Sequence, residues 1–291
     1  MKIGLQVSDF TWPGGPGTLA ADLRAIARAA EDAGFARLAV ADHLWQVNTN
    51  GPPENAMLEA YTTLGFLAAC TSRIELLTWV SAVSFREPAL LAKCVTTLDV
   101  LSGGRAWLGI GAGWFEEEAR GLGLPFPPLA ERFERLEEAL QICLQMWSGD
   151  DGPYAGTHYV LDRTLNSPQP LQRPHPPILI GGGGERKTLR LVAQYAQACN
   201  LFADDDLAHK LAVLDKHCAA VGRDRSEIET TVVLPPRDPG PDGENTDVIV
   251  AELRQLATLG VDHVQLKVPR MVEIRPLELF GERIIPVVAA L

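Results

Sequence analysis

Short apolar runs alternate with helical patterns along almost the whole chain, and this alternation limits the possible folds more than any other feature. Apolar runs predict eight strands, at residues 3–7, 37–41, 74–80, 105–110, 178–180, 198–202, 228–234 and 263–268. Helical patterns follow them at about 18–33, 56–71, 88–101, 131–147, 185–196, 206–221, 246–259 and 276–290. Apolar strands that are joined one by one through helices indicate a buried parallel sheet. Eight such units predict an α/β fold closed into a (β/α)8 TIM barrel.

One interval interrupts this rhythm. Residues 148–177 contain no helical pattern and are rich in glycine and proline, so we predict a long insertion between the fourth helix and the fifth strand. A connection of this length is either a lid or a disordered linker. Tyr154, His158 and Tyr159 favour an ordered, docked segment, because disordered linkers contain few aromatic residues. No boundary between domains is evident, and we expect residues 1–291 to form a single domain.

Composition narrows the classes of function. The chain has 37 acidic and 26 basic residues, and the resulting charge of −11 disfavours nucleic acid as a partner. No apolar run reaches the roughly 18 residues that a membrane span requires. The first residues lack the pattern of a secretory signal, so we expect a cytoplasmic protein. The five widely separated cysteines predict small buried side chains and no metal site.

Polar residues at the C-terminal ends of the predicted strands are the candidate site residues, because barrel enzymes carry their active sites there. Asp42 and His43 follow the second strand. An acid beside a histidine can hold one imidazole tautomer and leave the other ring nitrogen for proton transfer. The alternative is a helix-capping aspartate and a solvated histidine. Trp79, at the end of the third strand, either packs in the core or forms one wall of a slot for a planar ligand.

Glycine-rich turns follow the fourth and fifth strands. Gly111 and Gly113 let a ligand approach the backbone closely, although this pattern is a weak signal and no dinucleotide fingerprint. The turn at 181–184 has four consecutive glycines, followed by two cations, Arg186 and Lys187. Free backbone N–H groups before a helix, together with these cations, predict a cradle for an anion. A tight turn with solvated cations is the alternative.

These residues, in this order, resemble the luciferase-like monooxygenase superfamily of flavin- and deazaflavin-dependent barrels. The segment Leu-Asp-Val-Leu-Ser-Gly-Gly-Arg at 98–105 is specific, and residues 181–190 resemble the branch that depends on coenzyme F420, an 8-hydroxy-5-deazaflavin. The resemblance implies an oxidoreductase that transfers a hydride between C5 of the deazaflavin and a small organic substrate with a C=C, C=N or C=O bond. It also implies a homodimer.

The resemblance further implies roles for individual residues. His43 would donate or accept the proton, with Asp42 and Glu116 as further catalytic residues. The peptide bond between Trp79 and Val80 would be cis, behind the ring of the cofactor. The residues that would contact the cofactor are Asp42, His43, Thr78, Trp79, Val80, Gly111, Ala112, Gly113, Trp114, Gly181, Gly182, Gly183, Gly184, Glu185 and Arg186.

The pattern departs from that of the sugar-phosphate dehydrogenases in this family. Trp45 stands two residues after His43 instead of four, and Glu116 is displaced, which argues against a sugar-phosphate substrate. Two other functions stay open, an FMN-dependent two-component monooxygenase of the same superfamily and a non-catalytic flavin- or deazaflavin-binding protein. Because the chain and the cofactor are both anionic, we expect Arg186, Lys187 and Arg190 to form a local basic pocket.

Overall fold

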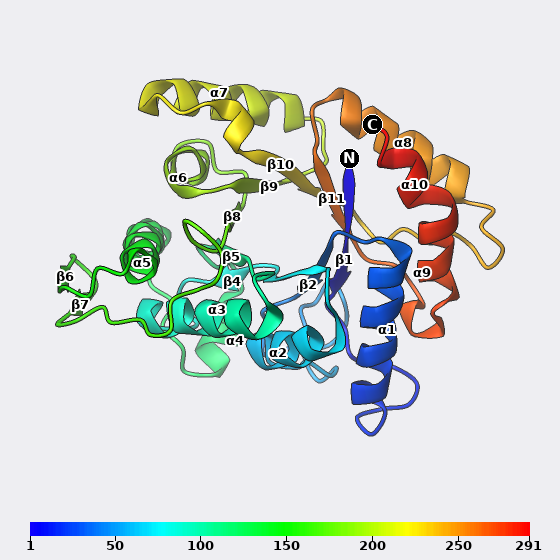
Figure 1. Cartoon of the computed structure of the whole chain (residues 1–291), viewed down its shortest axis with the longest axis horizontal. Coiled ribbons are helices and arrows are strands. Elements are labelled where there is room, and N and C mark those ends of the chain that lie inside the picture. The colour runs from blue at the N-terminus through cyan, green and yellow to red at the C-terminus, as the bar shows by residue number, and fades with distance from the viewer.

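The strands form one parallel sheet that curves into a barrel, with helices around it (Figure 1). The computed structural model describes all 291 residues. The strands are β1 (Lys2–Val7), β2 (Arg37–Val40), β3 (Glu75–Thr78), β4 (Ser81–Ala82), β5 (Leu108–Gly111), β8 (Ile178–Gly181), β9 (Ala198–Phe202), β10 (Glu229–Val233) and β11 (His263–Leu266). Their order is β3-β2-β1-β11-β10-β9-β8-β5-β4. A bridge between Leu76 and Ala106 joins the two edges of this sheet, so the predicted TIM barrel is confirmed.

The third predicted strand is divided into two pieces. Residues 74–80 were expected to be continuous, but β3 ends at Thr78 and β4 begins at Ser81. Between them, the peptide bond joining Trp79 and Val80 is cis, as the family resemblance implies. Counting β3 and β4 as one strand, the barrel has eight positions, and β8 lies opposite β1 across the ring.

The helices surround the sheet in the predicted order. They are α1 (Leu19–Ala33), α2 (Ala60–Cys70), α3 (Pro88–Ser102), α5 (Leu129–Ser148), α6 (Thr188–Tyr195), α7 (Leu207–Val221), α8 (Thr246–Thr258), α9 (Arg275–Leu279) and α10 (Ile285–Val288). A π-helical turn at Phe280–Ile284 joins α9 to α10. The short α4 (Glu116–Gly121) was not predicted, because it has too few residues to show a helical period. None of the helices is both long and apolar enough to cross a bilayer.

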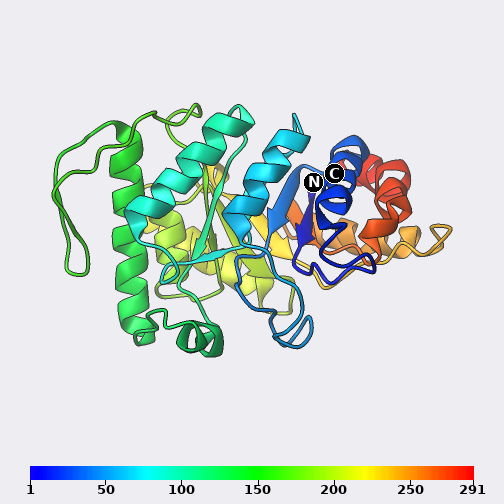
Figure 2. The same cartoon turned by 90° about the horizontal axis from the view of Figure 1, so that it is seen from below.

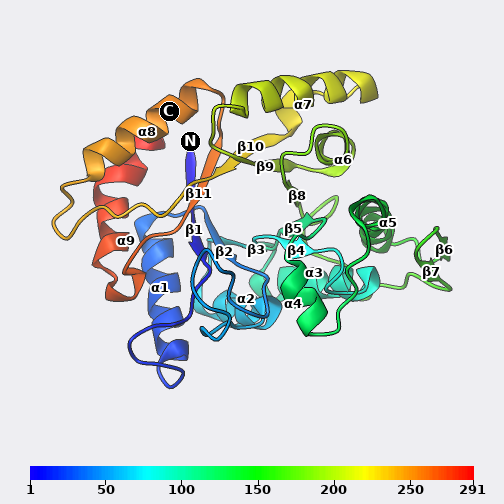
Figure 3. The same ribbon diagram turned by 180° about the vertical axis from the view of Figure 1, so that it is seen from behind.

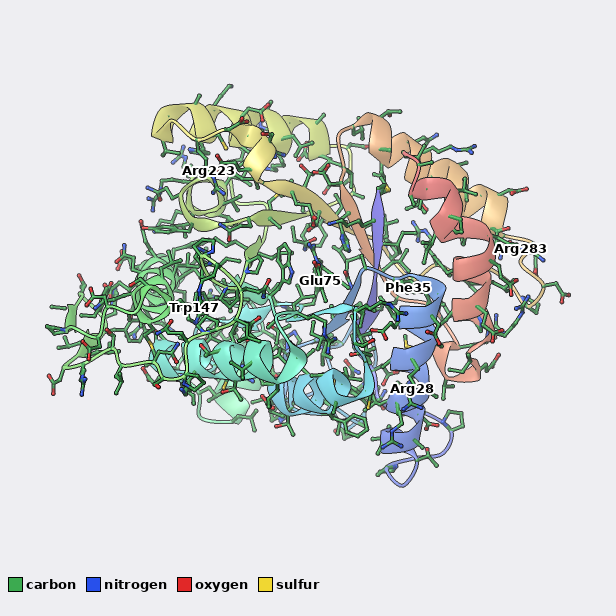
Figure 4. The ribbon with its side chains drawn as sticks, in the orientation of Figure 1. Arg28, Phe35, Glu75, Trp147, Arg223 and Arg283 are labelled. Atoms are coloured by element: carbon green, nitrogen blue, oxygen red, sulfur yellow. The ribbon has the colours of Figure 1, made fainter.

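One end of the barrel is closed by buried ionic groups. The guanidinium of Arg37, at the start of β2, is fully buried and donates to Glu75 at 2.7 Å and to Glu229 at 2.5 Å. It also lies 3.8 Å from the ring centre of Trp107. Glu75 is visible inside the ring of strands in Figure 4. These groups lie at the N-terminal ends of the strands. The two main cavities lie at the opposite end, which we call the mouth.

The insertion is ordered and docked outside the barrel. It contains a short antiparallel hairpin of β6 (Tyr154–Ala155) and β7 (Val160–Leu161). Glu138 of α5 accepts hydrogen bonds from the backbone N–H of Thr157 at 2.7 Å and of Tyr159 at 3.0 Å. Asp99 of α3 binds the N–H of Leu171 at 2.6 Å. In Figure 2 the insertion runs along the outside of α5, whose residue Trp147 is labelled in Figure 4, so it does not cover the mouth as a lid.

The cysteines serve as small packing residues and make no disulfide bonds. Cys143, Cys199 and Cys218 are buried, whereas Cys70 and Cys94 are half-buried. Burial raises the pKa of the Cys143 thiol to about 12 and that of Cys199 to about 11, so both stay protonated at neutral pH. No cluster of histidine, cysteine, aspartate or glutamate side chains is arranged to hold a metal ion.

Candidate active site

His43 lies at the mouth, where two aromatic rings and a buried carboxylate hold its imidazole. The ring centres of Trp114 and Phe115 lie 5.7 and 5.9 Å from that of His43, both in edge-to-face geometry. Nδ1 of His43 is 2.8 Å from Oε2 of Glu118, whose side chain is fully buried. The other oxygen of Glu118 accepts hydrogen bonds from the backbone N–H groups of Leu44 and Trp45. Because the carboxylate engages Nδ1, Nε2 is the nitrogen left for proton transfer.

Glu118, rather than the predicted Glu116, is therefore the acid that accompanies His43. Glu116 is exposed and pairs with Arg120, with an N–O distance of 2.6 Å. Both glutamates belong to α4, and residues two apart on a helix face different directions. The sequence contains three consecutive glutamates here, so only the start and rotation of the helix decide which of them turns inward. Figure 3 shows α4 in front of α3, at the mouth.

Asp42 was predicted to accompany His43, and the structure corrects this prediction. Its fully buried carboxylate accepts two hydrogen bonds from Arg86, at 2.5 and 2.9 Å, and one from Ser81 Oγ at 2.6 Å. Asp42 and His43 are neighbours in the chain, but their side chains bind different groups, Arg86 and Glu118. Burial opposes the charge of Arg86, but Asp42 and Glu59 outweigh it and raise the pKa of the guanidinium. Asp42 thus anchors the segment that follows the cis peptide.

The predicted cofactor contacts from the third strand are unequally accessible. Thr78 is fully buried and donates from Oγ1 to the carbonyl of Gly109 at 3.0 Å. Trp79 is also buried and packs in the apolar cluster inside the barrel. Of the two predicted roles, core packing and a wall of a ligand slot, the structure therefore favours core packing. Val80 is half-buried. Of these three residues, Val80 is therefore the one best placed to meet a ligand.

The glycines of the fourth and fifth strands let the backbone approach Val80 closely. A Cβ at Gly111 would lie 3.2 Å from the Val80 side chain, and one at Gly181 would lie 3.1 Å from it. Gly113 has a φ of +79°, and Ala112 is half-buried beside it. Trp114 is exposed and stacks on Phe115. These turns therefore shape the wall of the mouth around the cis peptide.

The four-glycine turn after β8 borders a cavity of about 530 Å³. Gly182 has a φ of +117°, and a Cβ at Gly183 would meet no atom closer than 3.9 Å. The cavity is lined by Leu129, Ala130, Phe133, Gly183, Gly184, Glu185, Arg186, Lys187 and Lys210. It therefore combines exposed backbone, three cations and an apolar wall from α5.

The cations of this cavity differ from the predicted set. α6 begins at Thr188, so Arg186 and Lys187 lie in the turn before the helix, instead of its first turn as predicted. Arg186 is exposed and forms no ion pair, whereas Arg190 points away and binds Glu137 at 2.6 Å. The place expected for Arg190 is taken by Lys210 of α7.

Lys210 is paired with a carboxylate inside the cavity. Its ammonium binds Glu185 at 2.6 Å, which raises the pKa of Lys210 and lowers that of Glu185. No local sequence motif predicts that Lys210 borders the four-glycine turn, because this lysine belongs to the next β/α unit.

A second cavity, of about 370 Å³, lies on the opposite side of the mouth, at the ends of β1 and β11. It is lined by Gln6, Ser8, Asp9, Trp12, Thr49, Asn50, Pro236, Lys267, Val268, Pro269, Arg270, Met271 and Val272. β2, which ends just before His43, is the neighbour of β1 in the sheet. The two cavities thus lie on opposite sides of the mouth, and the segment with His43 follows the strand next to the second of them.

Comparisons with known proteins identify the family. The family model described as luciferase-like monooxygenase matches residues 1–236. The F420-dependent glucose-6-phosphate dehydrogenase of Microbacterium testaceum is 35% identical over 209 residues, which cover 69% of this chain and 59% of that protein. The FMNH2-dependent dimethylsulfone monooxygenase of Pseudomonas putida is 32% identical over 160 residues, covering 55% of this chain and 42% of that protein. The chain thus matches less than two thirds of the length of these relatives.

A solved structure shares the fold over nearly the whole chain. The coenzyme F420-dependent tetrahydromethanopterin reductase of Methanopyrus kandleri superimposes with a TM-score of 0.80 at 18% identity, covering 98% of each chain. This similarity supports the barrel assignment, and the family model covers most of the same residues. The chain therefore belongs to the luciferase-like monooxygenase family.

Proposed function

We propose that the protein is an F420-dependent oxidoreductase, which transfers a hydride between the deazaflavin and a small organic substrate. The cavity beside the four-glycine turn carries this proposal, because it offers exposed backbone and an unpaired cation to an anionic group. A relative named as F420-dependent also matches the chain at 35% identity. The acidic chain, with a charge of −11, would otherwise repel an anionic cofactor.

The residues present fit the phosphate of such a cofactor. A Cβ at Gly183 would occupy space in the cavity, since its nearest neighbours are 3.9 Å away. Arg186 has no carboxylate partner, and Lys187 contacts only the carbonyl of Ala130 at 3.5 Å and the ring of Phe133. We propose that Gly183, Gly184, Arg186 and Lys187 hold the phosphate. The planar ring would then lie against Val80 and the turn at 111–114.

His43 is the proposed proton-transfer residue. The deazaflavin, when bound, supplies a hydride carrier, and the protein supplies orientation and proton transfer. Glu118 accepts from Nδ1 of His43 and so keeps the proton of the neutral imidazole on that nitrogen. His43 can then accept a proton at Nε2, or donate one from it when the ring is charged. Trp114 and Phe115 limit the movement of the imidazole.

An FMN-dependent monooxygenase is the second candidate. The Pseudomonas putida relative that bears such a name supports it, and a glycine cradle with cations would hold the phosphate of FMN equally well. The arrangement of His43 and Glu118 favours a catalytic function over the third alternative, a binding protein without turnover.

Titration of the purified apoprotein with F420 and with FMN tests the proposal. We expect F420 to bind with a Kd below about 10 μM. Arg186→Gln should weaken F420 binding about tenfold, because the unpaired guanidinium contributes roughly 1.4 kcal/mol to phosphate binding. Tight binding of FMN with none of F420 would overturn the assignment.

A control and a catalytic arm complete this experiment. Arg28 is exposed on α1 (Figure 4). Arg28→Gln changes the net charge as Arg186→Gln does and should leave F420 affinity unchanged. Oxidation of reduced F420 is then followed spectroscopically with enones, imines and ketones. His43→Ala should retain F420 affinity and lose at least tenfold in turnover, whereas equal turnover in both proteins would contradict the role of His43.

A further inference from the structure

The cavity at the ends of β1 and β11 contains a cation without a counter-ion. Lys267 follows β11 directly, is half-buried, and donates a hydrogen bond to Oδ1 of Asn50 at 2.6 Å. No carboxylate lies within ion-pair distance of its ammonium. Arg270, in the same cavity, is instead neutralised by Asp238 at 2.9 Å and Glu273 at 3.1 Å. In a chain with 37 acidic residues, a half-buried lysine without an ion-pair partner is unusual, and its charge is available to an external anion.

A second observation at this cavity also indicates a ligand. Gln6 of β1 lines it and is only 8% exposed, yet its buried Oε1 has no hydrogen-bond partner. Buried polar atoms are almost always paired, and no protein group hydrogen-bonds to this amide, so the amide is available to a bound molecule. Asp9, by contrast, is already engaged, because its carboxylate accepts from the N–H of Thr11 at 2.9 Å.

The walls of the cavity indicate the size and polarity of the ligand. Trp12, Met271 and Val272 supply an apolar surface beside the polar groups. A volume of about 370 Å³ suits a small organic molecule. The loop after β2 is fixed against β1, because Gln46 donates to the carbonyl of Ser8 at 3.1 Å, so the cavity is largely preformed. It lies across the mouth from the glycine cradle, so both could be filled together.

We infer that this cavity holds the substrate, and that the substrate is a small organic anion whose charged group binds Lys267 while a polar group hydrogen-bonds to Gln6. That the bound anion is a substrate rests on the proposed function. That the cavity binds an anion does not. Burial lowers the pKa of Lys267, and Asp9 partly opposes that change, which agrees with an ammonium whose charge is incompletely compensated.

Binding of simple probes tests the inference without turnover. Benzoate, benzamide and inorganic phosphate are titrated by calorimetry or ligand-observed NMR into the protein with and without F420. We expect benzoate to bind at least tenfold more tightly than benzamide, its uncharged analogue of the same shape. Lys267→Met should remove this preference, because it keeps the aliphatic stem and removes the charge. If phosphate binds more tightly than benzoate and Lys267→Met abolishes this binding, the anion site is supported and a phosphate group is its preferred ligand.

Controls separate this inference from the proposed function. Lys216→Met, on the exposed face of α7, should leave benzoate binding unchanged, and Lys267→Arg should largely retain it. F420 titration of each variant reports on the opposite cavity and shows that the variant is folded. Equal benzoate affinity in wild type and Lys267→Met would overturn the inference, whatever the F420 result. Failure of F420 binding alone would overturn the proposed function and leave the anion site intact.

Discussion

The buried carboxylate of Glu118 joins two segments of the mouth that are far apart in the chain. It accepts hydrogen bonds from the backbone of Leu44 and Trp45 and contacts Nδ1 of His43, 75 residues away. A buried carboxylate is stable only when such donors surround it. Glu118 therefore positions His43 and fixes the backbone immediately after it.

Replacing Glu118 with glutamine should destabilise the protein by about 1 to 3 kcal/mol. The amide is neutral, and its nitrogen cannot accept a hydrogen bond from Nδ1 of His43 as the carboxylate does. Denaturant unfolding measures this difference. Glu116→Gln is the matched control, since Glu116 is exposed and pairs only with Arg120. We expect that control to unfold like wild type. Equal effects of the two substitutions would contradict the assigned role of Glu118.

At the residue scale, the sequence predicted some functional groups and missed others. His43 and Arg186 lie at the mouth as predicted, because a strand end and a glycine turn are local features. Asp42 was predicted at the mouth but is buried against Arg86. Glu118 and Lys210 were missed, because their roles depend on the rotation of one helix and on the next β/α unit.

At the scale of elements, the two pieces of the third strand depend on a glycine in the neighbouring strand. A Cβ at Gly109 would lie 2.0 Å from the carbonyl oxygen of Thr78, so any other residue would push β5 away from β3. Thr78 Oγ1 also donates to the carbonyl of Gly109. The glycine therefore holds together the segment that contains the cis peptide and the turn that lines the mouth.

Gly109→Ala should reduce the free energy of unfolding by about 3 kcal/mol, because the clash is with backbone and cannot be relieved by a rotamer change. Gly65→Ala is the contrasting substitution. Gly65 lies within α2, and a Cβ there would meet nothing within 4 Å. It should stabilise the helix by roughly 0.5 to 1 kcal/mol. Thermal and denaturant unfolding of both variants would show the opposite signs, and loss of stability in both would refute this account.

At the scale of the whole molecule, the barrel is closed at one end and accessible at the other. Arg37 bridges Glu75 and Glu229 beneath the barrel interior, and its guanidinium stacks on Trp107. A buried charge of this kind costs much when one partner is removed, because the others lose their compensation. The group thus closes the end of the barrel opposite the mouth.

Arg37→Met should destabilise the protein by about 3 kcal/mol, since it leaves Glu229 without its buried partner. Adding Glu229→Gln in the double variant should recover part of that loss, as a double-mutant cycle by denaturant unfolding can measure. Arg73→Met, which removes an exposed arginine, is the control and should unfold like wild type. Strictly additive losses at Arg37 and Glu229 would argue against a direct coupling.

The sequence by itself determined the order of the strands and helices, the insertion and the strand ends where the site lies. Hydrophobic period and turn residues are local properties, so they can be recognised without knowing what each element contacts. Only the tertiary structure decided which carboxylate meets His43, which cations border the glycine turn, and that Lys267 and Gln6 share a cavity. These contacts join residues from separate β/α units, and they depend on side-chain directions that the closure of the barrel sets.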